Sequence, residues 1–133
     1  MPGIYNILKS KMGQALFDWQ NDTINAVLLA DNYAYNDLHS EWSDITSSEV
    51  VGNGYQTGGQ PLQEKSISAP GNNMTYLGAD PNWIVSTITA RYLVLYDSTQ
   101  SFLICCYEFD QNYSTINGPF TIQITNGIYF TIS

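Results

Sequence analysis

The side chains best suited to catalysis are one histidine and a few carboxylates. His39 is the single histidine of the chain, and Glu41 follows it in an acidic segment. A Ser/His/acid triad needs such a pair beside an exposed serine, but the sequence has no Gly-x-Ser-x-Gly elbow to present one. Glu108 and Asp110 alternate along a predicted strand, so they share a face as a glycosidase pair does. Because such pairs more often mark the hydrated end of a strand, we predict no catalytic residues and expect that the protein is not an enzyme.

Cofactor and metal motifs are incomplete. The run 52–58 (GNGYQTG) fails the dinucleotide fingerprint, because Thr57 stands where the third glycine belongs. The run 110–114 alternates oxygen side chains but lacks the glycine and the closing glutamate of a calcium loop, so a looser cation site is only a lesser alternative. Cys105 and Cys106 are adjacent, so in a strand they point to opposite faces and do not pair with each other. We predict no cofactor and no metal.

Aromatic side chains in the acidic segment suggest binding rather than catalysis. Tyr33, Tyr35 and Trp42 lie close together there. Aromatic residues are enriched at protein interfaces, and they also form sugar-binding platforms. We expect protein contact and keep carbohydrate binding as an alternative. The residues predicted to contact a partner protein are Ile4, Leu8, Trp19, Tyr33, Tyr35, His39, Trp42 and Tyr55.

The composition limits the class of partner. The chain has 12 acidic and 4 basic residues, which gives a net charge of −8. Nucleic acid and anionic membranes both attract basic patches, so neither is an expected partner. Charged residues make up 12% of the chain, against about 25% in a typical domain. A surface rich in neutral polar groups costs little to desolvate and suits a protein that partners cover.

Alternation with a period of two predicts strands through most of the second half of the chain. The longest run is 83–96, in which one row should face a core and the other is mixed. The apolar row consists of Ile88, Ala90, Tyr92, Val94 and Tyr96. The mixed row consists of Thr87, Thr89, Arg91, Leu93 and Leu95. Its apolar end predicts that the strand finishes buried on both sides, and Arg91 needs a carboxylate partner if it is buried too.

Further elements complete the predicted fold. Strands are expected at 23–30, 62–69, 74–77, 102–109, 120–125 and 128–132. Asn126-Gly127 favours a type I′ turn, which predicts that the last two strands form a hairpin. A short amphipathic helix is expected at 4–17. The residues predicted to have structural roles are Gly52, Gly54, Gly58 and Gly59 in tight turns, and Arg91 and Tyr92 in the long strand.

Together these elements predict one mainly-β domain over residues 1–133. We expect an antiparallel β-sandwich or jelly-roll-like fold with a short N-terminal helix. Residues 1–22 form an N-terminal helical or arm segment, residues 31–60 a long contact loop, and residues 61–133 a strand-rich core. The N-terminal residues lack the basic and apolar regions of a signal peptide, so we expect the chain to stay in the cytoplasm until assembly or lysis.

Several segments together resemble a family of small structural proteins of tailed bacteriophages. They are the strand at 23–29, the Tyr/Asp/His loop at 37–42, the glycine segment at 49–62, the strand at 83–96 with ITARY at 88–92, and the end of the chain at 117–132. The glycine segment and the ITARY sequence are most specific as a pair. The resemblance implies a virion component and carries no catalytic residues.

On this resemblance we expect a non-enzymatic virion structural protein that is assembled in the host cytoplasm. The leading expectation is a capsid decoration or cement protein, which stabilises the shell by binding the major capsid protein. It would act as a homo-oligomer, for which a trimer suits the local three-fold positions of a shell. The alternatives are a tail, neck or fibre-attachment component and a carbohydrate-binding β-sandwich module.

Overall fold

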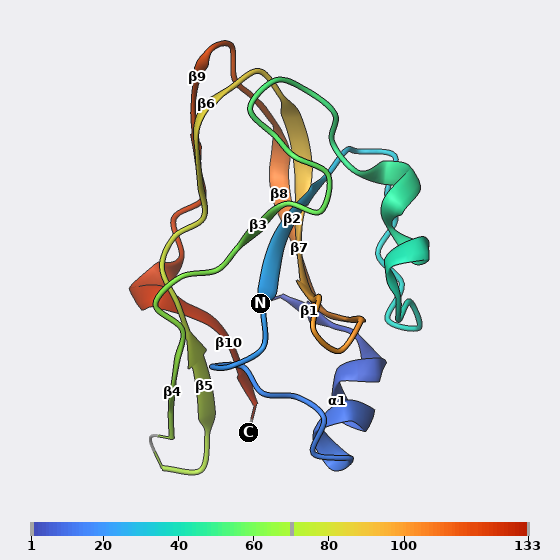
Figure 1. Cartoon of the computed structure of the whole chain (residues 1–133), viewed down its shortest axis with the longest axis vertical. Coiled ribbons are helices and arrows are strands. Elements are labelled where there is room, and N and C mark those ends of the chain that lie inside the picture. Colours follow the sequence, from blue (N-terminus) through green and yellow to red (C-terminus); the bar gives the residue numbers. More distant parts are fainter. Residues whose placement is uncertain (1, 70, 133) are drawn as a thin grey trace.

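A computed structural model describes residues 2–69 and 71–132, and it is mainly β with antiparallel strand pairs (Figure 1). This confirms the predicted fold class, including one short helix near the N-terminus. The helix is α1 (Asn6–Gly13). The strands are β1 (Gly3–Ile4), β2 (Ile24–Leu29), β3 (Gln60–Pro61), β4 (Ser66–Ser68), β5 (Met74–Leu77), β6 (Asn82–Ser86), β7 (Thr89–Asp97), β8 (Phe102–Ser114), β9 (Gly118–Thr121) and β10 (Ile128–Ile132). Short 3₁₀ helices are η1 (Trp42–Asp44), η2 (Thr46–Ser48) and η3 (Thr125–Gly127).

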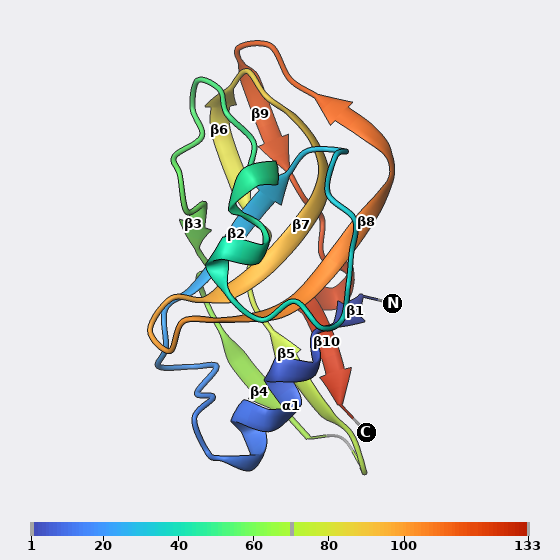
Figure 2. The same ribbon diagram turned by 90° about the vertical axis from the view of Figure 1, so that its right-hand side faces the viewer.

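The strands form a central sheet and two smaller sheets. The central sheet has the order β1-β8-β7-β2-β3, the second β10-β5-β4, and the third pairs β6 with β9. Because β6 leads into β7 and β8 leads into β9, the β6–β9 pair continues the β7–β8 hairpin. Figure 2 shows how this ribbon bends and runs back along the central sheet. The bend is held by the buried Ser86 hydroxyl, which donates to the Gly118 carbonyl at 3.0 Å and lies 2.9 Å from the Thr115 hydroxyl.

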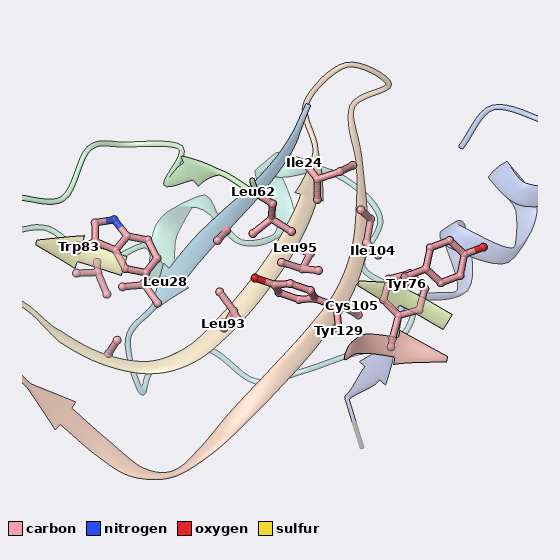
Figure 3. Packing of buried hydrophobic residues seen from close by; sticks show 14 of the residues in the cluster. Ile24, Leu28, Leu62, Tyr76, Trp83, Leu93, Leu95, Ile104, Cys105 and Tyr129 are labelled. Atoms are coloured by element: carbon pink, nitrogen blue, oxygen red, sulfur yellow. The ribbon is translucent and has the colours of Figure 1, made fainter. Parts of the chain in front are cut away.

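Apolar side chains pack on both faces of the central sheet. One face packs against the two smaller sheets, and we call this cluster the sandwich core. Figure 3 shows Leu28, Leu93 and Cys105 within it, with Trp83 toward one end and Tyr76 toward the other. The opposite face carries Val27, Leu29, Tyr92, Val94 and Cys106, and the 31–49 segment covers it with Tyr33 and Ile45. We call this second cluster the loop core.

The predicted strand 83–96 is in fact two strands, and the set of side chains that faces the sandwich core changes along them. It is interrupted at 87–88, and the pairing of β7 with β8 shifts between Ala90 and Tyr92. Opposite Arg91, residues 109–112 of β8 bulge out of register. The shift places Ala90 in the sandwich core but Tyr92 in the loop core, so the prediction of one continuous apolar row was wrong. The prediction that the second half is buried on both sides is confirmed, because Leu93 and Val94 are fully buried in opposite clusters.

The predicted hairpin at 120–132 is not formed. Asn126 and Gly127 do adopt the left-handed conformation, with φ of 54° and 72°, but β9 pairs with β6 while β10 pairs with β5. The segment between them is held elsewhere, since the Ile122 amide donates to the Pro81 carbonyl and the Ile124 amide to the Asp80 carboxylate. The alternation at 122–125 therefore reflects partial burial of Ile122 and Ile124 and not strand pairing.

Other boundaries also differ from the predictions. The helix expected at 4–17 is limited to α1, and Ala15 beyond it has a φ of 59° that helices do not contain. The strand expected at 62–69 shrinks to β4, because Glu64 has a φ of 54°. Strand β8 extends to Ser114, beyond the strand predicted at 102–109, so the run 110–114 is also strand. Strands β5 and β10 have the predicted bounds.

Candidate functional site

Half of the residues predicted to contact a partner lie in the interior. Leu8, Trp19, Tyr33 and Tyr55 are at most 8% exposed. The Trp19 indole donates to the Leu77 carbonyl at 3.0 Å and packs edge-on against Phe130. Such rings fill space between layers that the chain cannot fill with aliphatic side chains alone. These side chains hold the fold together and are not available to a partner.

His39 belongs to a chain of hydrogen bonds that attaches the 31–49 segment to the central sheet. The Tyr5 and Tyr33 hydroxyls lie 2.7 Å apart, and the Tyr33 hydroxyl lies 2.9 Å from His39 Nδ1. Burial raises the pKa of the Tyr33 hydroxyl to about 12 and raises the pKa of the Tyr5 hydroxyl above that of Tyr33. Both hydroxyls therefore stay protonated at neutral pH. Among the side-chain hydrogen bonds of residues 2–69 and 71–132, the partner of His39 is Tyr33 and not a serine. The hydrogen bonds between Tyr5, Tyr33 and His39 therefore have a structural role, because they attach this segment to the rest of the fold.

The remaining predicted contact residues do not form one group, because Tyr35 contacts Ile4 and shares a hollow with His39, whereas Trp42 packs elsewhere. Tyr35 is 38% exposed, and its hydroxyl donates to the Ile4 carbonyl at 2.8 Å. Trp42 packs against Tyr96, with 5.3 Å between ring centroids. Tyr33, Tyr35 and Trp42 therefore do not form the shared aromatic platform that carbohydrate binding at these residues requires.

The carboxylates suggested as a catalytic pair have other partners. Glu108 accepts a hydrogen bond from Arg91 at 3.1 Å, with the two side chains 56% and 28% exposed. Asp110 accepts from the Tyr113 hydroxyl at 2.5 Å. In the part of the chain that the structure describes, no group of three His, Cys, Asp or Glu side chains is placed to hold a metal ion. Cys105 and Cys106 are unpaired and pack into opposite clusters, as the alternation predicts.

A buried pair of acids was missed by sequence reasoning. Asp97 at the end of β7 is fully buried and faces the carboxyl group of Asp22. Burial, and then the Asp22 carboxyl, raise the pKa of Asp97 to about 7. Lys65 donates to the Asp22 carbonyl beside them, and burial lowers the pKa of its ammonium group. The pair joins β2, β7 and the 62–65 segment.

Of the four most exposed large apolar side chains among the described residues, all but Leu38 gather at the end of the molecule opposite α1, at the top of Figure 1. Val51 is 95% exposed, Ile116 83% and Ile84 74%. In β6 the register shifts between Trp83 and Ser86, so Ile84 and Val85 both face solvent although strand neighbours normally alternate. We define the uncharged tip as residues 51–54, 82–89 and 114–118.

The tip carries no charged side chain. Its segments belong to longer runs without Asp, Glu, Lys or Arg, namely 50–63, 81–90 and 111–132. These runs are visible in the sequence, but only the fold brings them together. The charged groups that border the tip are already partnered: Glu49 accepts from the Tyr55 hydroxyl and the Gly58 amide, Asp31 accepts from Asn112, and Arg91 pairs with Glu108.

Two glycines let the 51–54 loop lie flat against the bent ribbon. A Cβ atom at Gly52 would come 2.2 Å from the Thr87 carbonyl oxygen, and one at Gly54 would come 1.9 Å from that of Val85. Gly54 also has a φ of 83°. The Thr87 amide donates to the Asn53 carbonyl at 2.9 Å, which closes the contact. The other predicted structural glycines, Gly58 and Gly59, also have positive φ and lie between this loop and β3.

Two hollows flank the apolar side chains of the tip. One, of about 490 Å³, lies between the glycine loop and β6 and is lined by Gln56, Gln60, Asn82, Ile84 and Val85 among others. The second, of about 630 Å³, is lined by Val51, Thr87, Thr115 and Ile116 among others. Both hollows are open and shallow, and amide, hydroxyl and aliphatic groups line most of their surface. Their chemistry suits a neutral, partly apolar surface.

Comparisons with protein-family models, with curated proteins and with solved structures gave no match. In the described parts of the chain, no helix has the length and apolar character to cross a membrane.

Proposed function

We propose that this chain is a non-enzymatic structural protein of a tailed-phage virion, foremost a capsid decoration or cement protein. The observation that carries the proposal is the uncharged tip, an exposed apolar surface on a protein of net charge −8. The resemblance to small phage structural proteins supplies the virion as its setting. A tail, neck or fibre-attachment position is the alternative, and the same surface would serve it.

Physical chemistry favours protein contact at this tip. Removing a large aliphatic side chain from water contributes about 1.5–3 kcal/mol, and Val51, Ile84 and Ile116 are almost entirely hydrated in the isolated chain. The polar groups around them are amides and hydroxyls, which cost far less to desolvate than charges. The buried centres of protein interfaces are likewise depleted in charged residues.

The test compares particles of the encoding phage with and without the protein. Particles that lack it are expected to lose DNA at lower temperature or milder osmotic shock, because a cement protein stabilises the assembled shell by binding it. Adding back the wild type should restore resistance, whereas Ile84→Asp should not, since it places a charge in the contact.

Leu38→Asp is the matched control for this test. Leu38 is 74% exposed, as is Ile84, but it lies in the acidic 31–49 segment. This variant should restore resistance as the wild type does. Equal resistance of particles with and without the protein would overturn the cement proposal, and imaging of the virion would then locate the protein on the tail or neck.

A further inference from the structure

We infer that the partner seated on the uncharged tip is a second copy of this chain. The inference rests on the proposed function in one respect only, that the tip is a protein-contact surface. It adds the identity of the occupant, which we argue from the charge distribution and from the shape of the tip.

The charge distribution restricts how two copies can meet. Each copy carries 12 acidic and 4 basic residues, and none of them lies in the tip. Two like charges 4 Å apart near a protein surface repel by about 4 kcal/mol, and repulsion persists over roughly 8 Å at physiological salt. A contact centred on the tip leaves Asp31, Glu49 and the Arg91–Glu108 pair at its rim, where solvent screens them.

The tip also has the shape that self-association requires. In a two-fold dimer the same patch serves both partners, so it must contain both projections and hollows. Ile84 and Val85 project beside the hollow lined by Gln56 and Asn82. The second hollow lies next to Val51 and Ile116. A projection of one copy can therefore enter the hollow beside β6 of the other, whose lining contains no carboxylate. The second hollow is bordered by Glu49, whose carboxylate already accepts from the Tyr55 hydroxyl and the Gly58 amide.

The salt dependence of association distinguishes this apolar contact from an electrostatic one. Added salt screens the repulsion between two acidic copies but leaves apolar burial intact. Association through the tip should therefore tighten as the salt concentration rises. A contact between acidic and basic patches would weaken instead.

The experiment is sedimentation equilibrium of the full chain over a range of protein concentrations, at low and high salt. The wild type and Leu38→Asp should show a mass above the monomer that rises with concentration and with salt. Ile84→Asp and Ile116→Asp should remain monomeric under the same conditions, with circular dichroism spectra like that of the wild type. Their unfolding midpoints should not change with protein concentration, whereas that of the wild type should rise.

Two results would overturn the inference: a wild type that is monomeric throughout, or tip variants that associate as the wild type does. A monomeric wild type that still stabilises particles through its tip would overturn this inference and leave the proposed function standing. A chain that associates through its tip but leaves particles unchanged would overturn the proposed function alone.

Discussion

At Asp97 the chain buries one carboxyl group against another, and this contact makes folding sensitive to pH. The Asp97 pKa of about 7 in the folded chain compares with about 3.9 for an unfolded aspartate. Between these values the folded state binds more protons than the unfolded state. The contribution of this group to the free energy of unfolding is therefore largest in acid and is lost as the pH rises from about 4 through the folded pKa, by at most about 4 kcal/mol.

Asp97→Asn should remove much of this fall, because the amide stays neutral at every pH. Urea unfolding at several pH values from about 4 to 8 measures the difference. The variant Asp37→Asn alters an exposed carboxylate and should keep the wild-type profile. Parallel pH profiles for the wild type and Asp97→Asn would show that the buried pair does not control the pH dependence.

The Arg91–Glu108 ion pair should contribute little to stability. Its groups are partly exposed and 3.1 Å apart, and hydrated pairs of this kind contribute about 0–1 kcal/mol. Arg91→Leu should therefore change the free energy of unfolding by less than about 1 kcal/mol in thermal or urea unfolding. A loss of several times that amount would mean that Arg91 supports the bulged pairing of β7 with β8 by more than its charge.

At the scale of elements, the glycine loop and the bent ribbon depend on each other. Gly54→Ala would force a Cβ atom against the Val85 carbonyl and strain a positive φ. The free energy of unfolding should fall by about 1–3 kcal/mol, and association through the tip should weaken because the loop carries Val51. Gly13→Ala is the control, since its Cβ atom meets open space at the end of α1. Equal stability of the two variants would contradict the proposed role of the loop contact.

Elements were predictable from sequence where local pattern and burial agree. Strand β2 follows from its apolar run, which is buried on both faces, and strands β5 and β10 follow from short strand-forming runs between turns. The hairpin at 120–132 was not predictable, because Asn126-Gly127 specifies a local turn but not which strands pair across it. The bulges at Ile84–Val85 and in β8 opposite Arg91 change which face of the sheet the following side chains occupy. No residue type in the sequence marks either position.

At the scale of the molecule, the fold separates an acidic body from an uncharged end. The sequence shows the charge-free runs, but their meeting at one end depends on β6 and β9 folding back over the central sheet. For some aromatic residues, the sequence suggests exposure to a partner where the fold buries them. Trp19 and Tyr33 lie among polar neighbours in the chain and resemble surface residues, yet both are buried, because contacts distant in sequence decide their burial.

The central claim is that the uncharged tip is the contact surface of this protein in a virion. A reconstruction of the intact particle at side-chain resolution tests it most directly. We expect to find the chain on the particle with Val51, Ile84 and Ile116 buried against a neighbouring protein subunit. A chain that is held by another surface, with these side chains facing solvent, would contradict it.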